Sequence, residues 1–571
     1  MNRAIRIRIS VVLGIFVAVV WLIWAPPRDV DMAAYAPANS LLYMETNDPL
    51  LVAQTLMETD AWKLLGKTGA HPNTGQRRWL TKLVRITGIG PIQSVILSRA
   101  QVAIVVTNLG TILDETTLRL KPEAALIVET HTSETRIRST VEHAIKELAY
   151  ATYHNPSLRR TWVNGVEFVE WRDAEGLRQI VTAIVGSLVV VGNSETAVQQ
   201  VLDSVARRTP SLKNDVNLQR LRREFAEHQS LTFGYVPQQK SAHLLSFAVP
   251  LILSRTPSDD GLQKIVANGA ANLFGSIAWG SRPVQNGIED RYLISLQPSL
   301  LSQLQAAFSQ VMSVNVNSRR LPESAYSVTH YRFEDPALAW EGLKTSISSN
   351  VDALSAVVFS SLLESALTSY GIHEPEKFLR SVNGEILTLR LARDGEHTML
   401  IAGIKDREAL RGVLSGSMKI QALTRGCVDF FADAEGEMGA CLLSDLVIVG
   451  TLGDVRLYSE NAVLNARLDE EQMRRITFFA PPSRPSPIVT YVDDSDRVRQ
   501  FLSAIMAASG TPAEELVNLE PAIAKLPYSS TETRIVGQGL ERITRSPLGQ
   551  FSTLLPLLIP DERGPQDSPP R

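Results

Sequence analysis

The sequence predicts an α+β fold in which largely antiparallel sheets are covered by helices, built as two tandem related lobes after one N-terminal transmembrane helix. Three observations lead to this fold class. Short runs rich in β-branched residues alternate in irregular order with stretches of 3.6-residue hydrophobic periodicity. Hairpin turn signals, Asp-Ala-Glu-Gly and Asn286-Gly287, favour antiparallel pairing. Several of these segments also recur, in the same order, in the second half of the chain.

The first element is an unbroken apolar run over residues 9–25 (ISVVLGIFVAVVWLIWA), closed by two prolines. A helix of this length spans about 25 Å, which is just enough to cross a hydrocarbon core of about 30 Å. By the positive-inside rule, residues 1–8 lie in the cytoplasm and the body after Arg28 lies outside it. The residues that flank the anchor and fix it in this orientation are Arg3, Arg6, Arg8, Trp21 and Trp24.

Two other interpretations of this run stay open. A cleaved signal peptide needs small residues at positions −3 and −1 of its cleavage site, and Ala34-Tyr35-Ala36 offers them. This site lies late, about ten residues after the run, and Pro37 follows it, so cleavage is disfavoured. A helix buried in a soluble core is the second alternative. We expect a retained anchor.

The composition is that of an ordinary globular protein. Of the 571 residues, 44% are hydrophobic and 20% are charged, so a proper core is expected. A net charge of −3 gives no case for nucleic acid, which requires a strongly basic face. The expected partners are therefore the lipid bilayer, through the N-terminal helix, and either an envelope protein or an apolar ligand.

Internal repetition predicts the two lobes. The segment GVEFVEWRDAEG from Gly165 leads to GSLVVVG, and GCVDFFADAEG from Gly426 leads to SDLVIVG. Weaker matches follow the same order: Asp48-Pro49 with Asp335-Pro336, Leu126-Ile127 with Leu400-Ile401, LTFGYV from Leu231 with IVTYVD from Ile488, and NGIEDRYLIS from Asn286 with QGLERITRS from Gln538. Chance rarely gives such collinear matches, so we expect a first lobe over residues 28–318 and a second over 319–555, related by duplication.

Within the lobes the patterns place elements as follows. Strands are expected over residues 102–107, 125–129, 166–171, 187–191, 231–236 and 292–296. Helices are expected over residues 134–150, 195–207, 300–311, 351–370 and 496–508. The apolar runs 244–253 and 554–559 are too short to span a membrane, so core packing is expected, with an exposed apolar face as the alternative. The polar, proline-rich tail over residues 560–571 is expected to be disordered.

The two cysteines, Cys427 and Cys441, flank the turn signal Asp433–Gly436 almost symmetrically. If that turn closes a hairpin, the two side chains lie across from each other on neighbouring strands, at a separation that a disulfide can bridge. An oxidising compartment then favours the bond. The alternative is a pair of buried thiols that pack as small apolar residues.

Two segments resemble motifs of an uncharacterised bacterial family of exported, membrane-anchored proteins, known only as a domain of unknown function. Pro37-Ala38-Asn39-Ser40-Leu41-Leu42-Tyr43 is similar to its P-A-x-S/T-x-x-Y opening after the anchor, and residues 371–386 are similar to its G-I/L-x-P-E-K-x-L…G-E-I/V segment. The first lobe departs from the second motif, since Ala100-Gln101 replaces Gly-Glu. The resemblance covers most of residues 36–545. It implies a bacterial inner (cytoplasmic) membrane location with the body in the periplasm or outside, and it brings no catalytic residues.

Motifs for known chemistry are missing from the sequence. There is no G-x-S-x-G, no Ser three positions before a Lys, and the string that begins at His373-Glu374 lacks the second histidine of H-E-x-x-H. The densest carboxylate cluster, Asp493-Asp494-Ser495-Asp496, precedes a predicted helix. It could hold Ca²⁺, but capping by Ser495 or Asp496 is favoured because the glycine and later glutamate of a calcium loop are absent.

We therefore expect no catalytic, cofactor or metal site. The leading hypothesis is a single-span membrane-anchored extracytoplasmic protein that acts as a non-enzymatic binding or structural module of the bacterial envelope. One alternative is a carrier or sensor that holds an apolar ligand between the lobes, where clefts often form. The other is an unrecognised hydrolase, because catalytic groups need not be near one another in sequence.

Overall fold

The computed structural model describes residues 29–64, 100–114, 117–153, 155–176, 178–242, 244, 268–308, 325–393, 396–421, 426–463, 474–476, 478–479, 486–508 and 514–552. The predicted anchor, the tail and nearly all of the apolar runs 244–253 and 554–559 lie outside these ranges. Within them, no helix is both long and apolar enough to cross a bilayer.

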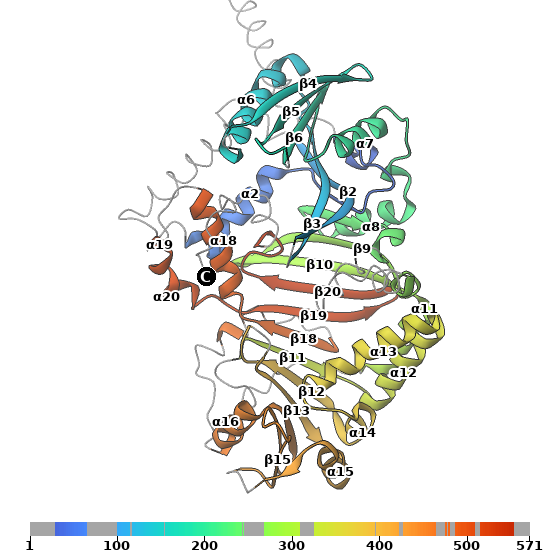
Figure 1. Cartoon of the computed structure of the whole chain (residues 1–571), viewed down its shortest axis with the longest axis vertical. Coiled ribbons are helices and arrows are strands. Elements are labelled where there is room, and N and C mark those ends of the chain that lie inside the picture. Colours follow the sequence, from blue (N-terminus) through green and yellow to red (C-terminus); the bar gives the residue numbers. More distant parts are fainter. Residues whose placement is uncertain are drawn as a thin grey trace, which may run out of the picture.

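The described residues form an α+β structure around one antiparallel sheet of 20 strands (Figure 1). The strands of the first half of the chain are β1 (Leu42–Thr46), β2 (Gln101–Asp114), β3 (Thr117–Glu129), β4 (Ser157–Val163), β5 (Val166–Arg172), β6 (Gln179–Val185), β7 (Leu188–Gly192), β8 (Thr232–Val236), β9 (Phe274–Val284) and β10 (Gly287–Leu296). Those of the second half are β11 (Ser327–Arg332), β12 (Val382–Arg390), β13 (Thr398–Ile404), β14 (Lys419–Ile420), β15 (Asp429–Ala432), β16 (Met438–Leu442), β17 (Leu446–Thr451), β18 (Ile488–Val492), β19 (Ser529–Val536) and β20 (Gly539–Ser546).

The order of the strands in the sheet is the same in both halves. The first half runs β4-β5-β6-β7-β3-β2-β1-β8-β9-β10. The second half runs β14-β15-β16-β17-β13-β12-β11-β18-β19-β20. The two runs meet edge to edge where β10 pairs with β20, so the sheet passes from one half to the other without a break.

The register repeats together with the order. Tyr235 on β8 and Tyr491 on β18 occupy the same place in the two halves. Likewise, the register partners Phe168 and Ala183 correspond to Phe430 and Cys441. The segment pairs matched by sequence lie on corresponding elements wherever the structure describes them. The match of LTFGYV with IVTYVD is shifted by one residue, because the structure aligns Tyr235 with Tyr491.

Short helices cover both faces of the sheet. Those of the first half are η1 (Met32–Ala34), α2 (Pro49–Glu58), α3 (Asp60–Lys63), α6 (Glu134–Thr152), α7 (Glu195–Val205), η3 (Leu212–Asn214), α8 (Val216–Glu227) and α11 (Pro298–Ala307). Those of the second half are α12 (Pro336–Asn350), α13 (Ala353–Thr368), α14 (Pro375–Arg380), α15 (Arg407–Ser417), α16 (Leu452–Val463), α18 (Ser495–Ala508), α19 (Glu514–Val517) and α20 (Glu520–Ile523).

Each half has a core on either side of its strands. In the first half, η1, η3, α7 and α8 bury one face around Phe168 and Phe225, while α6 covers the other through Ile137. In the second half, α16 lies on one face through Val455, and α12, α14 and α15 cover the other around Phe378. Alternation of side chains along each strand separates these cores, because neighbouring residues point to opposite faces.

Local sequence explains where the elements begin and end. Asp48 and Asp335 each precede a proline, and their carboxylates accept first-turn N–H groups of α2 and α12. Asn286, at a positive φ of 60°, closes the two-residue turn between β9 and β10. The predicted strands coincide with β2, β3, β5, β7, β8 and β10, and the predicted helices with α6, α7, α11, α13 and α18. The largest differences are that β2 extends seven residues beyond its predicted end and that β3 begins eight residues before its predicted start. The α+β class and the antiparallel pairing are confirmed.

Candidate functional site

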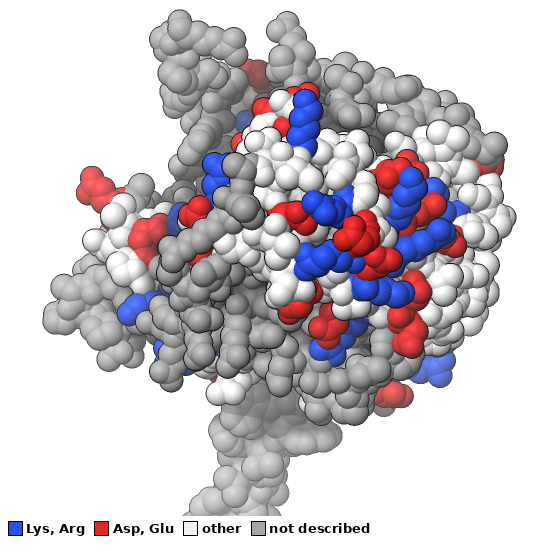
Figure 2. All heavy atoms as spheres, turned by 90° about the horizontal axis from the view of Figure 1, so that it is seen from below, with Lys and Arg blue, Asp and Glu red and all other residues white. Residues whose placement is uncertain are grey.

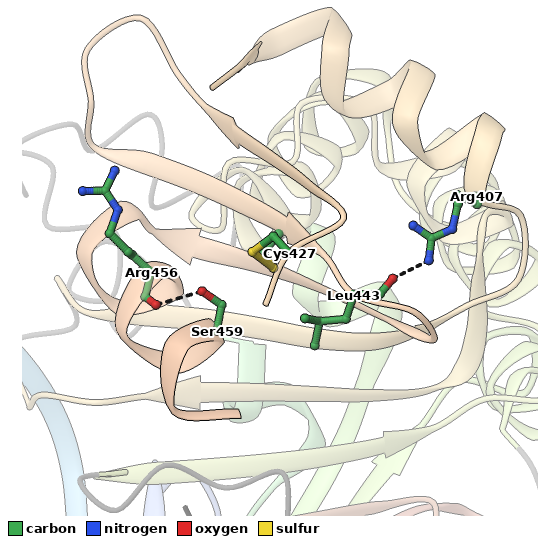
Figure 3. The surroundings of a disulfide bond; sticks show 6 residues. Arg407, Cys427, Leu443, Arg456 and Ser459 are labelled. Atoms are coloured by element: carbon green, nitrogen blue, oxygen red, sulfur yellow. Dashed lines mark hydrogen bonds between the residues drawn. A yellow bond between two sulfur atoms is a disulfide. The ribbon is translucent and has the colours of Figure 1, made fainter. Parts of the chain in front are cut away.

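The anchor flanks Arg3, Arg6, Arg8, Trp21 and Trp24 lie outside the described residues. Cys427 and Cys441 are joined by a disulfide in the second half, with their Cα atoms 5.5 Å apart (Figure 3). Both side chains are buried in the core that α16 covers. Nearby, Arg407 of α15 donates to the carbonyl of Leu443, which holds the strand end after β16. The bond therefore lies inside a packed layer.

The geometry of the pair differs in one detail from a simple cross-strand contact. The register partner of Cys441 is Phe430, and Cys427 lies just before β15 begins. The turn between β15 and β16 is built as the sequence suggests. The carboxylate of Asp433 accepts from the N–H groups of Gly436 and Glu437, and Gly436 has a φ of 77°.

The carboxylate cluster before α18 caps that helix, but through a different residue from those expected. The carboxylate of Asp493 accepts from both the N–H (2.9 Å) and the hydroxyl (2.5 Å) of Ser495. Its other oxygen faces Arg475 at 3.1 Å. Asp494 and Asp496 have their own partners, Arg497 and Arg499. Within the described ranges, no group of three His, Cys, Asp or Glu side chains is arranged to hold a metal ion.

The most distinctive cluster of charges lies at the join of the two half-sheets. Eight side chains form a chain of alternating sign: Arg282, Glu289, Arg545, Glu532, Arg534, Glu541, Arg291 and Glu224. Seven of them come from β9, β10, β19 and β20, and Glu224 comes from α8. Register places the strand members on one face of the sheet, since Glu289 pairs with Arg545 and Arg534 pairs with Glu541.

Most distances within this junction network are those of charge-assisted hydrogen bonds, whereas Arg534 and Glu541 lie 3.8 Å apart. Arg545 donates to Glu289 at 2.8 Å and to Glu532 at 2.6 Å. Arg291 donates to Glu541 at 2.7 Å and to Glu224 at 2.9 Å. The side chain of Glu532 is fully buried, and its partners Arg534 and Arg545 are 11% and 12% exposed. The network is neutral in sum, and each carboxylate is committed to a guanidinium.

The opposite face of the same strands carries a row of hydroxyl groups. The register sets Asp290, Thr544, Thr531, Thr490, Thr329 and Thr388 side by side across β10, β20, β19, β18, β11 and β12. Thr531 and Thr544 are hydrogen-bonded at 3.0 Å, and Thr329 and Thr490 at 3.1 Å. Both bonds join neighbouring strands within the second half of the sheet, β19 to β20 and β18 to β11.

Asp290 begins this row and is buried. Its carboxylate accepts from the hydroxyl of Ser281 at 2.5 Å and from the N–H of Gln550 at 2.7 Å. Burial raises the pKa of Asp290 to about 6, against the opposing effect of these hydrogen bonds. The side chain of Gln550 donates to Ser281 at 2.6 Å. The cluster thus fastens the segment after β20 to β9 and β10.

A second buried ion cluster lies in the first half. Arg222 of α8 faces Glu45 of β1 and Asp31, each at 2.6 Å, and the hydroxyl of Tyr43 donates to Glu45 at 2.6 Å. Burial raises the pKa of Glu45, while Arg222 lowers it. The cluster fixes the segment around η1 onto the sheet.

A hollow beside the junction is lined by both charged and apolar side chains. It measures about 220 Å³, and its lining includes Arg220, Glu224, Leu293 and the turn Val536–Gly539. On the end of the molecule that carries β15 and α15, Lys and Arg are interspersed with Asp and Glu (Figure 2), as in the pair Arg411 and Asp429 at 3.3 Å.

The comparisons with known proteins add little. No protein-family model and no curated protein matches the chain. One solved structure, titled "Structure of crystal form I of TP0453", is similar over 50% of this chain and 89% of that chain, with 11% sequence identity and a TM-score of 0.22. A TM-score this low carries no argument about fold or function. The resemblance to the exported bacterial family stays a prediction.

Sequence reasoning missed the junction network. The signal was present in the alternating charges of IEDRYL on β10, TETR on β19 and LERITR on β20. Alternation normally marks a strand with one solvated face. Here the charges point into the junction and neutralise one another, so that interpretation would have been wrong.

Proposed function

We propose that this chain is a single-span, membrane-anchored protein of the bacterial envelope whose body lies outside the cytoplasm and serves as a non-enzymatic binding or structural module. The observation that carries the location is the disulfide between Cys427 and Cys441. Disulfides persist in oxidising compartments and are rare in the cytosol. The disulfide and the arginines before residues 9–25 both support a body that lies outside the cytoplasm.

The body, in this proposal, consists of two lobes over residues 28–318 and 319–555 that arose by duplication. The repeated strand order and register support it, because unrelated halves would have no reason to share both. The matched aspartates at the start of α2 and α12 support it as well.

The non-enzymatic role is supported by how the ionisable groups are used. In the junction network every carboxylate lies against an arginine, which holds strands together and leaves no carboxylate poised as a base. Ser281 and Asp290 are 1% and 2% exposed, so their contact is closed off from a substrate in solution. No observation on the described residues favours the apolar carrier or the hydrolase.

Topology is tested by cysteine labelling of the full-length chain in intact cells. A Val216→Cys variant, at a residue 80% exposed, is expected to react with a membrane-impermeant maleimide. The matched Asn2→Cys variant is expected to react only after the membrane is permeabilised. The reverse pattern would overturn the proposed orientation.

The native cysteines offer an independent measurement. Mass mapping without reductant is expected to find the peptide pair joined through Cys427 and Cys441. Two free thiols in protein taken from the envelope would contradict the extracytoplasmic location. Proximity labelling in the native cell is a separate experiment that identifies the partner that the module binds.

A further inference from the structure

At one end of the molecule lies a strand edge that pairs with no other strand among the described residues. β4 is the outermost strand of the first half and pairs with β5 along all seven of its residues, at the end where Figure 1 also shows α6. The corresponding outer strand of the second half, β14, has two residues. Proteins usually keep such edges short, because their unpaired N–H and C=O groups attract other strands.

The turn that joins β4 to β5 shows which main-chain groups point outward. Val163 and Val166 close a two-residue turn in which Asn164 and Gly165 both have positive φ, 51° and 82°. The two residues that close such a turn are joined by two N–H···O=C hydrogen bonds. Hydrogen-bonded and non-hydrogen-bonded pairs then alternate along the strand. It follows that Leu158, Arg160 and Trp162 direct their N–H and C=O groups away from β5.

The side chains of these three residues share one face of the strand. Trp162 is 70% exposed and Leu158 is 47% exposed. Arg160 between them is neutralised by Glu167 at 2.8 Å and Glu142 at 3.2 Å. The edge therefore presents two large apolar side chains on either side of an arginine whose charge is already compensated.

The net charge of this end of the molecule indicates which kind of partner can bind at the β4 edge. Residues 134–178 contain seven Lys or Arg and seven Asp or Glu. A neutral end does not attract an acidic peptide or an anionic lipid surface. It does not repel a second copy of itself either. The strand is also self-complementary: with Arg160 at the centre of an antiparallel pair, Leu158 lies opposite Trp162 of the second copy, and the reverse.

We propose that the chain forms a symmetric dimer in which β4 pairs antiparallel with β4 of a second copy, centred on Arg160. The sheet then continues from one copy into the other. The same antiparallel pairing of two edge strands already joins the two halves of one chain, where β10 pairs with β20. The proposal does not depend on the compartment of the body, so its failure would leave the proposed function unaffected.

The test separates the main-chain hydrogen bond from the side chain. In the full-length chain, Arg160→Pro removes the outward N–H but leaves the ladder to β5, which does not use it. Arg160→Ala removes the same side chain and keeps the N–H. Both variants are checked by circular dichroism for an intact fold. We expect Arg160→Pro to raise the dimer dissociation constant about tenfold or more relative to Arg160→Ala, because each copy loses a bond.

A cysteine variant measures the register. Arg160→Cys places two thiols opposite each other on the dimer axis, so a disulfide-linked dimer is expected. Ile420→Cys on β14 keeps the β4 edge and should dimerise without forming that covalent link. Equal dissociation constants for the proline and alanine variants, or no linked dimer, would overturn the proposal. Brominated lipid should quench Trp21 and Trp24 of the anchor in any case. A further part of the quenching that is lost in Trp162→Phe would overturn the proposal, since a membrane would then contact the β4 edge.

Discussion

Arg291 on β10 and Ile543 on β20 face each other in the ladder that joins the two half-sheets. Each is also the fourth residue after the glycine that opens its strand, Gly287 or Gly539. The two hairpins, β9–β10 and β19–β20, are thus related by a local two-fold axis through this pair. Arg282 and Glu289 in one hairpin correspond to Arg534 and Glu541 in the other, so both hairpins supply charges to the junction network in the same way.

The network makes a sharp prediction about stability. Glu532→Gln keeps the shape of the side chain but leaves the network with one excess positive charge beside the buried Arg534 and Arg545. We expect a loss of about 3 kcal/mol in the free energy of unfolding, measured by chemical denaturation, because breaking one member of a buried ion pair is costly.

The matched control is an exposed ion pair. Glu374 and Lys377 are 2.6 Å apart with side chains 47% and 65% exposed. Glu374→Gln should change the free energy of unfolding by about 0.5 kcal/mol or less, since solvent screens the pair. Equal effects of the two substitutions would show that the junction network does not stabilise the sheet.

The sequence could predict the features whose signals lie within a few neighbouring residues. The turn at Asp433–Gly436 depends on a few adjacent residues and is built as predicted. The caps at Asp48 and Asp335 are equally local, since each aspartate directly precedes a proline at the helix start. The edge-to-edge contact of β10 with β20 depends on residues about 250 positions apart and has no local signal. The same holds for Ser281 and Gln550, which meet at 2.6 Å. The acceptor at the start of α18 is Asp493, two residues before Ser495 and three before Asp496, and helix ends are where such shifts are common.

The disulfide should stabilise the second half. It closes a loop with a sequence separation of 14, for which loop entropy suggests about 3 kcal/mol. We expect Cys427→Ala with Cys441→Ala to lower the thermal midpoint, and reductant to lower the midpoint of the unmodified chain without affecting the double variant. A midpoint that reductant leaves unchanged in the unmodified chain would show that the bond adds nothing.

The two aspartate caps should behave alike. Asp335→Ala removes the acceptor for the N–H groups of Ala337 and Leu338 at the start of α12. Asp48→Ala does the same for Leu51 in α2. We expect each to cost about 1 kcal/mol in the free energy of unfolding, and each matched Asn variant to cost less, because Asn also caps well. If Asn and Ala variants are equally unstable, the carboxylates act through charge and not through capping.

Asp290 should make the stability depend on pH. Burial raises its pKa to about 6 in the folded chain, above the value of about 3.9 for an unfolded one. The folded state then binds the proton more tightly, so the contribution of Asp290 to stability is full below about pH 4 and is lost as the pH rises through about 6. Its size across that window is on the order of 3 kcal/mol. In Asp290→Asn, which does not ionise, this component of the unfolding free energy is expected to disappear, leaving only the pH dependence of other groups. Parallel curves for the two proteins between pH 4 and pH 7 would mean that Asp290 titrates alike in the folded and unfolded states, and that the bonds from Ser281 and Gln550 offset its burial.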